Sequence, residues 1–291
     1  MPRALVSTGI ELEYDTTGDP ADPAIILVMG FTAQMTQWDD SFVKMLADGG
    51  RFVIRFDNRD CGLSTKFDGV ESNSDKVIQA VMLGDPMPPV AYTLSDMAAD
   101  TVGLLDHLGI EKAHVVGASM GGMIAQTVAI EHPHRVHSLV SIMSIPGDLA
   151  YGQPAPEAAE ALVATPPAER EAYIEFSTTY MIWHSKRYQD AERTKANAAR
   201  DFDRSFYPEG GPRQMAAIYA SGDRSEGLRN LKVPTLVIHG LEDILLPPDG
   251  GQRVAELVPG AHLMLMKDMS HDLPEPLWPL IVGSILGHTS L

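Results

Sequence analysis

The chain has 291 residues, of which 44% are hydrophobic and 21% are charged, and this balance is typical of a globular protein rather than a disordered one. Its formal net charge of −17 repels phosphate backbones and anionic lipid headgroups, so we expect neither nucleic acid nor a membrane as a partner. The single cysteine, Cys61, cannot form an internal disulfide, and no Cys/His spacing is typical of a metal site. Residues 1–7 lack the apolar core of a signal peptide, and no apolar run approaches the ~18 residues of a membrane span. We therefore expect a cytoplasmic protein without a bound metal.

Short apolar runs alternate with longer amphipathic stretches along most of the chain. The runs predict strands at residues 24–29, 51–56, 113–116, 136–143, 235–238 and 262–266. Helical patterns lie between them, at about residues 95–109, 120–132, 250–258 and 275–287. Continuous apolar strands suit a parallel sheet that is covered on both faces, so the alternation predicts a doubly wound α/β fold. Residues 10–14 and the segment before Asp22 further predict an antiparallel hairpin at the first edge of the sheet.

The alternation stops between Pro146 and about Tyr207. This stretch contains four prolines and two helix-forming segments, residues 169–184 and 188–202, but no strand-like run. We interpret residues 147–207 as a helical cap, after which a further helix is expected at residues 213–220. The remaining parts, 1–146 and 208–291, then form one core of about 230 residues, which is within the ~200–250 residues of a single α/β domain.

The strongest chemical signal is Gly117-Ala118-Ser119-Met120-Gly121, placed directly after one predicted strand and directly before a helix. This is G-x-S-x-G in the strand–turn–helix setting of a nucleophile elbow. The serine in such a turn has a strained backbone, so the neighbouring positions must lack bulky side chains. The alternative is an ordinary glycine-rich turn that carries a surface serine, and the correct flanks on both sides favour the elbow.

These residues resemble the α/β-hydrolase-fold serine hydrolases. Within that superfamily the chain is most similar to the esterase branch that includes aclacinomycin methylesterase. The narrower resemblance rests on residues 27–30, 55–64, 113–121 and 233–238, and it leaves the cap unmatched. It implies an α/β-hydrolase fold with a mostly parallel eight-stranded sheet, flanking helices and a helical cap inserted after strand 6. It also implies a cofactor-independent enzyme.

A serine hydroxyl is a weak nucleophile until a base removes its proton, so a histidine and a carboxylate should follow in the order Ser, Asp or Glu, His. Among ten histidines we choose His271, because the loop after the last predicted strand can return to the edge of the sheet that carries the elbow. For the acid we choose Asp243 over Glu242, because it matches the superfamily's G-x-x-D-x-x-x-P pattern. Asp148 is the second choice, since some relatives take the acid from the preceding strand.

The tetrahedral intermediate needs two N–H donors directed at its oxyanion. The backbone amide of Met120, directly after the nucleophile, is expected to supply one of them. We assign the other to the amide of Phe31, in the loop after the first parallel strand. Many relatives have His-Gly in this loop, whereas this chain has Met29-Gly30, a difference that changes the hydrogen bonds supporting the loop.

Two further groups of residues are interpreted as structural. Residues 57–64 follow a superfamily pattern that we attribute to Asp–Arg pairing and a turn that Gly62 permits, with no direct catalytic role. Cys61 lies in this segment and is interpreted as a small, partly buried residue. The cap is rich in aromatic residues, most of which are expected to form its own core, although one or two facing Ser119 would create an apolar site.

Together these residues predict a serine esterase that acts on a small-molecule carboxylic ester through an acyl-enzyme. The same triad would serve perhydrolysis of the haloperoxidase type, lactone opening or hydrolytic carbon–carbon cleavage, so these remain alternatives. A catalytically silent ligand receptor is a third possibility, which an intact triad disfavours. A dinucleotide-binding or P-loop interpretation fails, because neither G-x-G-x-x-G nor G-x-x-x-x-G-K-[ST] is present.

Overall fold

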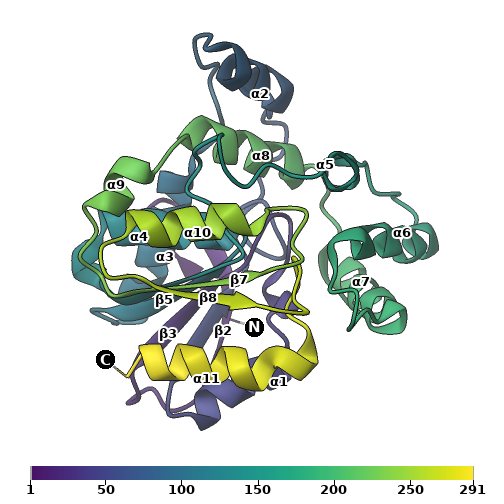
Figure 1. The fold of residues 1–291 in the computed structure, drawn as a ribbon. Coiled ribbons are helices and arrows are strands. Elements are labelled where there is room, and N and C mark those ends of the chain that lie inside the picture. Colours follow the sequence, from purple (N-terminus) through teal and green to yellow (C-terminus); the bar gives the residue numbers. More distant parts are fainter. Residues whose placement is uncertain (1, 291) are drawn as a thin grey trace.

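The computed structural model describes residues 2–290, which are built around one eight-stranded sheet (Figure 1). Its strand order is β1-β2-β4-β3-β5-β6-β7-β8. In this order the strands from β4 to β8 are parallel to one another, whereas β2 pairs antiparallel with both β1 and β4. The strands are β1 Arg3–Leu5, β2 Glu11–Thr17, β3 Ala24–Val28, β4 Phe52–Phe56, β5 Ala113–Ala118, β6 Val136–Ile142, β7 Thr235–Gly240 and β8 His262–Met266. The predicted eight-stranded, mostly parallel α/β sheet is confirmed.

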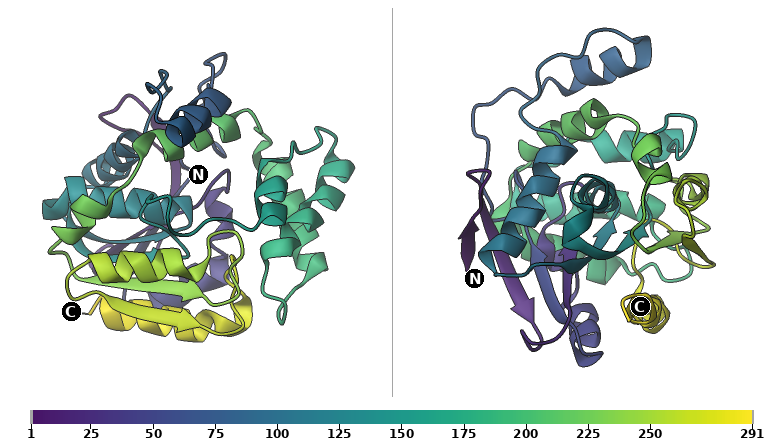
Figure 2. Two further views of the ribbon diagram at one scale, coloured as in Figure 1. Left: turned by 45° about the horizontal axis from the view of Figure 1, so that its top comes forward. Right: turned by 90° about the vertical axis from the view of Figure 1, so that its left-hand side faces the viewer.

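Helices cover both faces of the sheet (Figure 2). Helices α1 and α11 pack on one face, and α3, α4 and α10 lie on the other. The α-helices are α1 Asp40–Asp48, α2 Ser74–Leu83, α3 Leu94–His107, α4 Met120–Glu131, α5 Pro156–Val163, α6 Arg170–Phe176, α7 Ala191–Ser205, α8 Gly210–Ser221, α9 Ser225–Arg229, α10 Pro248–Leu257 and α11 Trp278–His288. Short 3₁₀ helices are η1 Met35–Gln37, η2 Pro133–Arg135, η3 Ser177–Trp183 and η4 Glu275–Leu277. In residues 2–290 no helix is both long and apolar enough to cross a membrane.

The central strands are apolar along their whole length because both of their faces are buried. Successive side chains of a strand point to opposite sides of the sheet. Ile26 and Val115 accordingly belong to the core under α3 and α4, whereas Ile25 and Val116 belong to the core under α1 and α11. All four side chains are fully buried. This double burial explains why the sequence shows continuous apolar runs rather than an alternating pattern.

The hairpin predicted at the first edge has a different partner from the one expected. Strand β2 does not fold back on the segment before Asp22; it pairs antiparallel with β1 on one side and with β4 on the other. The turn between β1 and β2 is closed by hydrogen bonds between Val6 and Ile10 and between Gly9 and Val6, both at 2.9 Å. Gly9 has φ +82°, a left-handed conformation that glycine adopts without strain.

Residues 147–207 contain only helices and connecting loops, and they stand at one end of the core (Figure 1). The long helix expected at residues 169–184 is divided into α6 and the 3₁₀ helix η3. At the junction the Ser177 and Thr178 hydroxyls donate to carbonyls three residues earlier, at 2.6 and 2.8 Å. Such side-chain bonds compete with regular α-helical pairing and explain the change of helix type.

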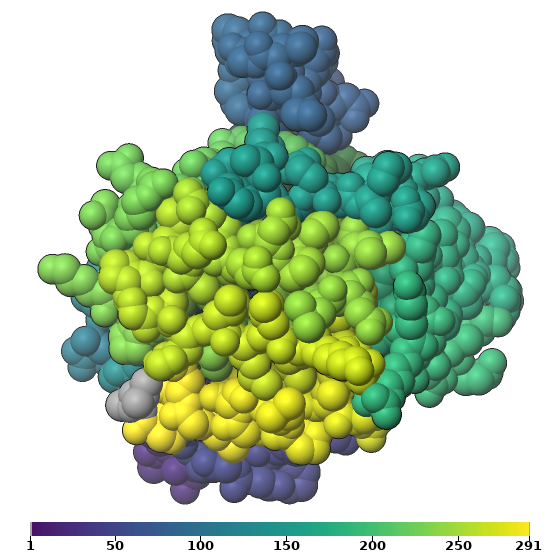
Figure 3. Space-filling view, in the orientation of Figure 1, coloured from purple at the N-terminus to yellow at the C-terminus, as the bar shows by residue number. Residues whose placement is uncertain are grey.

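The structure also contains an element that the sequence analysis did not predict. Residues 68–91 leave the core, form helix α2 and return, so that they stand out from the surface (Figure 3). The base of this arm is tied by a 3.0 Å hydrogen bond from Asn73 Nδ2 to the carbonyl of Pro89. Only Val77 and Ala80 of α2 are buried, which gives too short an apolar stripe for a clear helical pattern.

Candidate active site

Ser119 lies at the sharp turn between β5 and α4. Its backbone has φ 57° and ψ −123°, outside the regions that non-glycine residues normally adopt. The turn is held by hydrogen bonds on both sides: Ser119 N donates to Ile142 O at 2.9 Å, and Gly122 N donates to Ser119 O at 2.9 Å. The strained geometry predicted for a nucleophile elbow is therefore present at this residue.

The glycines of the motif are explained by the close approach of backbones. A Cβ atom on Gly117 would lie 2.0 Å from the carbonyl oxygen of Gly121, where α4 begins. A Cβ atom on Gly121 would lie 2.0 Å from the carbonyl oxygen of Val28, at the end of β3. Neither position has room for a side chain, so strand, turn and helix can pack together only with glycine at both places.

The predicted histidine and acid meet Ser119. His271 follows β8 and places Nε2 2.9 Å from Ser119 Oγ. Its Nδ1 lies 2.7 Å from Oδ2 of Asp243, in the loop after β7. The structure thus brings together Ser119, His271 and Asp243, which are far apart in the sequence. Glu242 and Asp148 make no hydrogen bond to His271, and Asp148 instead accepts from Ala150 N in a local turn.

Asp243 is held in place by more groups than a single imidazole. Its Oδ1 accepts from the backbone N–H groups of Leu245 and Leu246, both at 2.9 Å. The fully buried His239 brings Nε2 to 3.3 Å from Oδ2 and to 2.7 Å from the carbonyl of Leu246. Burial raises the pKa of Asp243, but the charges and hydrogen bonds of His271 and His239 outweigh this effect and lower the pKa to about 2. The carboxylate is therefore ionised at neutral pH.

His239, near the end of β7, is not among the site residues chosen from the sequence. Its proximity to Asp243 could have been anticipated, because the residue that ends a strand borders the loop that follows it. The structure gives His239 a contact with the acid rather than with the serine.

Two backbone amides close to Ser119 in the fold have no hydrogen-bond partner among the described residues. The loop after β3 passes close to the serine, since a Cβ atom on Gly30 would lie only 3.1 Å from Ser119 Cβ. Neither the Phe31 nor the Met120 amide donates a hydrogen bond to another described residue. The free amide of Met120 is at the N-terminus of α4, where the helix leaves its first N–H groups without partners. Phe31 and Met120 are the two residues predicted to form the oxyanion hole.

A cavity of about 1340 Å³ opens on Ser119 and His271. One wall is formed by the loop after β3 and by Trp38 and Trp278 of the core, and another by residues 162–208. The aromatic residues of that second wall are Tyr173, Tyr180, Trp183, Tyr188, Phe202 and Phe206. His184 also lines the cavity, and burial lowers its pKa, which favours the neutral imidazole near His271. More aromatic residues of this segment face the site than the sequence analysis expected.

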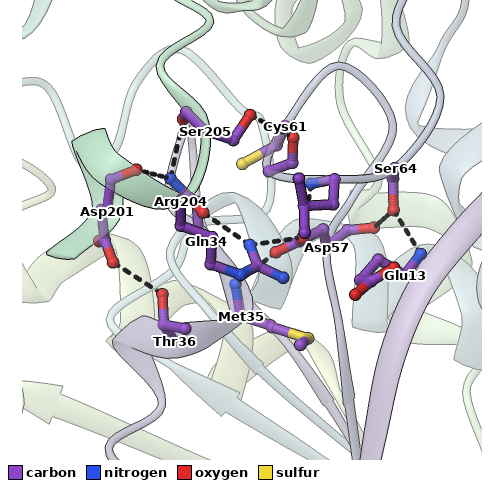
Figure 4. A network of polar contacts seen from close by, with 12 residues as sticks. Glu13, Gln34, Met35, Thr36, Asp57, Cys61, Ser64, Asp201, Arg204 and Ser205 are labelled. Carbon is purple, nitrogen blue, oxygen red and sulfur yellow. Dashed lines mark hydrogen bonds and ion pairs between the residues drawn. The ribbon is translucent and has the colours of Figure 1, made fainter. Parts of the chain in front are cut away.

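Two groups of contacts are among those that attach residues 147–207 to the loops around the site. The first is beside the histidine, where His271 N donates to Trp183 O at 2.9 Å and Ser185 Oγ donates to Asp272 at 2.8 Å. The second is a polar network at the C-terminal end of α7 (Figure 4). There Arg204 forms a 2.7 Å ion pair with the buried Asp57 and donates to Gln34 Oε1 at 2.6 Å.

The structure supplies the partners for the Asp–Arg pairing expected at residues 57–64. Each charged residue there pairs with a distant partner: Asp57 with Arg204, Arg59 with Asp100, and Asp60 with Arg213. The segment after β4 is thus a junction for several elements, and no local pattern could have shown these partners. Asp249 lies inside the first turn of α10 and accepts from Gly152 N.

Other groups do not take part in the site as a base or nucleophile. Burial raises the pKa of the Cys61 thiol well above its usual value, and its Sγ donates to Thr32 O. His288 contacts the carbonyl of Pro234 at the other end of the sheet. Within residues 2–290 no group of three or more His, Cys, Asp or Glu side chains is arranged to hold a metal ion.

The alpha/beta hydrolase fold family matches residues 23–275. The chain belongs to the α/β-hydrolase fold family. Among curated relatives, this α/β hydrolase is 25% identical to rhodomycin D methylesterase DauP of Streptomyces sp. (strain C5) and 26% identical to rhodomycin D methylesterase DnrP of Streptomyces peucetius. Each match covers 99% of this chain and 97% of the relative.

Solved structures show the same fold. The enol-lactonase from Burkholderia xenovorans LB400 superimposes with a TM-score of 0.76 at 23% identity, over 100% of both chains. The meta-cleavage product hydrolase CumD from Pseudomonas fluorescens IP01 gives a TM-score of 0.78 at 20% identity, over 100% of this chain and 97% of that one. At these identities the likeness concerns the architecture, and it leaves the substrate open.

Proposed function

We propose that this α/β hydrolase is a serine esterase that cleaves a carboxylic ester of the methylesterase type through an acyl-enzyme intermediate. The observation that carries the proposal is the position of His271, with one ring nitrogen 2.9 Å from Ser119 Oγ and the other 2.7 Å from Asp243 Oδ2. This chain of hydrogen bonds is the arrangement that activates a serine. The relation to two methylesterases over nearly the full chain supports the ester bond as the target.

The proposed reaction has two halves. Ser119 Oγ attacks the ester carbonyl carbon while His271 Nε2 takes the hydroxyl proton, and Asp243 fixes the tautomer and stabilises the imidazolium. The proton passes to the leaving alcohol, the carbon–oxygen bond of the ester breaks, and an acyl-serine forms. Water then attacks the acyl group with His271 again as base, which releases the acid and restores Ser119. The amides of Phe31 and Met120 stabilise the oxyanion in both halves.

The size of the cavity narrows the class of substrate. Pockets for drug-sized ligands typically measure about 300–1,000 Å³, and this cavity of about 1340 Å³ exceeds that range. Its lining includes the aromatic side chains of Tyr173, Tyr180 and Trp183, together with acidic and basic side chains such as Asp190 and Arg193. We infer a bulky ester with a large apolar or aromatic part and a small alcohol such as methanol, in keeping with the ester bond that the relatives' names give.

The test is a panel of aryl acetates, longer acyl esters, methyl esters of polycyclic acids and simple lactones, with wild type and Ser119→Ala in parallel. We expect the wild type to cleave esters and Ser119→Ala to lose at least about 10⁴-fold in kcat. Ser144→Ala is the matched control, because Ser144 is fully buried and its hydroxyl has no partner among the described residues. Preferred cleavage of lactones would move the proposal to a lactonase, and equal activity of Ser119→Ala would overturn it.

A further inference from the structure

The loop that carries the Phe31 amide has an unusual backbone. Thr32, the next residue, has φ 55°, a left-handed conformation that is rare for a β-branched side chain. Such a conformation persists only where surrounding contacts determine it. Met29 and Gly30, the residues before Phe31, have no polar side chain, so the support of this loop must come from other residues.

That support comes from α8, the first helix after the cap segment. Gln214 on this helix is fully buried, and its Oε1 accepts a hydrogen bond from Thr32 N at 2.8 Å. Its Nε2 donates to the carbonyl of Arg59 at 2.9 Å, in the loop after β4. One side chain thus ties the loops after β3 and β4 together. Both ends of its amide are used, and the identities of the two partners fix which end accepts and which donates.

The helix also packs directly against this loop. One turn before Gln214, a Cβ atom on Gly211 would lie 3.2 Å from Thr32 Cγ2 and 3.7 Å from Phe31 Cζ. The absence of a side chain at Gly211 lets α8 approach closely enough for Gln214 to reach the Thr32 amide.

Hydrogen bonds fix the peptide groups on either side of the Phe31 amide. After it, the Phe31 carbonyl accepts from Thr32 Oγ1 at 2.8 Å, and Gln214 holds the N–H of the same peptide group. Before it, the Met29 carbonyl accepts from Asn58 Nδ2 at 2.8 Å. The Phe31 N–H itself remains without a partner among the described residues.

We propose that Gln214 is a positioning residue, which sets the direction of the Phe31 N–H by holding Thr32 in its left-handed conformation. The inference rests on the proposed function, because it requires that the Phe31 amide binds the oxyanion. Gln214 touches no reacting atom. It acts through the backbone, so its loss should weaken binding of the tetrahedral state more than binding of the substrate.

The experiment compares Gln214→Leu with Gln214→Glu. Leucine has nearly the same size and removes both hydrogen bonds, whereas glutamic acid keeps an oxygen that can accept from Thr32 N. Gln126→Leu is the matched control: Gln126 is also fully buried, but its amide bonds Ser141 on β6 and Arg224 rather than the loop after β3. The measurements are kcat and KM with an activated ester, the melting temperature, and inhibition by phenylboronic acid, which mimics the tetrahedral state on Ser119.

We expect Gln214→Leu to lower kcat by about 10- to 100-fold, with KM within about 2-fold and with boronate affinity reduced in parallel. Gln214→Glu should recover part of both losses, and Gln126→Leu should lower only the melting temperature. Gln214→Leu could instead lose stability as Gln126→Leu does and keep wild-type kcat and boronate affinity. In that case Gln214 has only a structural role and this proposal is wrong, whereas the proposed esterase function is unaffected. If the wild type neither cleaves esters nor binds the boronate, the proposed function fails first and this inference with it.

Discussion

The backbone N–H of His271 donates to the carbonyl of Trp183 at 2.9 Å, and this bond joins the proposed base to the segment that forms the outer wall of the cavity. The loop of the base is therefore not held by the core alone. Ser185, two residues beyond Trp183, adds a second contact to this loop, because its hydroxyl donates to Asp272 at 2.8 Å. We call the contacts of Trp183 and Ser185 with residues 271–272 the seam. The segment that lines the cavity therefore also supports the loop that carries His271.

The first prediction concerns this seam. Ser185 is fully buried, so Ser185→Ala leaves Asp272 without one of its donors. We expect a loss of about 1–2 kcal/mol in the free energy of unfolding, measured in urea, and a several-fold lower kcat because the His271 loop is less firmly held. Ser144→Ala, equally buried but without a hydrogen-bond partner among the described residues, should change neither quantity. Equal behaviour of the two variants would count against a role for the seam.

The second prediction concerns the ion pair between Arg204 and Asp57. The Asp57 side chain is fully buried, and burial raises its pKa even though Arg204 lies 2.7 Å away. Removing Arg204 by Arg204→Met leaves a buried carboxylate without its cation, so we expect a loss of about 3 kcal/mol in the free energy of unfolding. The double variant with Asp57→Asn should lose clearly less than the sum of the two single losses, since both remove the same interaction.

The control for this double-mutant cycle is an exposed ion pair within residues 147–207. Arg170 bonds Asp203 at 2.7 Å, but both side chains are largely in water. Arg170→Met should therefore change the urea midpoint little. Additive losses for Arg204 and Asp57, or a loss at Arg170 as large as that at Arg204, would show that burial does not decide the strength of these pairs.

Much of the fold could be predicted from local pattern. The buried strands and the helices between them follow from apolar runs and helical spacing, and the elbow follows from the order of residues around Ser119. The arm that carries α2 could not be predicted, because only Val77 and Ala80 of that helix are buried. The partner of β2 was predicted wrongly, because a strand pattern does not state which neighbouring segment completes a hairpin.

Some residues of the candidate site could likewise be predicted from the sequence, and others could not. Ser119, Asp243 and His271 could be chosen because each carries its own local sequence context after a strand. Gln214 and Arg204 could not, since their partners Thr32 and Asp57 are more than 140 residues away in the chain. Such residues act through contacts that only the folded chain creates, and they have no motif of their own.

The third prediction concerns acid sensitivity. Burial, with smaller effects of His137, Arg51 and His288, lowers the pKa of His114 to about 4. In the unfolded chain the pKa of a histidine is about 6.5, so between these values the unfolded state binds a proton that the folded state does not. Stability should therefore fall as the pH falls from about 6.5 to about 4, with a total contribution of roughly 2–4 kcal/mol from this residue.

The measurement is urea unfolding at intervals between pH 7.5 and pH 4.5. His114→Gln should be less stable than wild type at pH 7.5, where it loses the 2.8 Å contact with Ser138 Oγ, but its stability should depend less on pH. His134→Gln, at an exposed position, should follow the wild-type curve. Parallel curves for His114→Gln and wild type would show that His114 does not set the acid sensitivity.

The fourth prediction separates two glycines beside Ser119. Gly121→Ala would place a Cβ atom 2.0 Å from the backbone oxygen of Val28, and backbone cannot move aside cheaply. We expect a loss of more than about 4 kcal/mol or no folded protein. Gly30→Ala would place its Cβ atom 3.1 Å from Ser119 Cβ, a contact that a shift of a few tenths of an ångström relieves. That shift displaces the proposed nucleophile and the loop of Phe31, so kcat should fall about 10-fold or more while the melting temperature changes little.

Gly283→Ala provides the reference for both substitutions. Gly283 lies on the exposed side of α11, and nothing lies within 4 Å of a Cβ atom added there. Alanine is the better helix former, so this variant should gain about 0.5–1 kcal/mol in the free energy of unfolding and keep wild-type kcat. Far-ultraviolet circular dichroism, urea unfolding and ester turnover on the three variants then separate a packing defect from a displaced nucleophile. Full activity of Gly30→Ala would mean that the loop after β3 does not need to lie against Ser119 during the reaction.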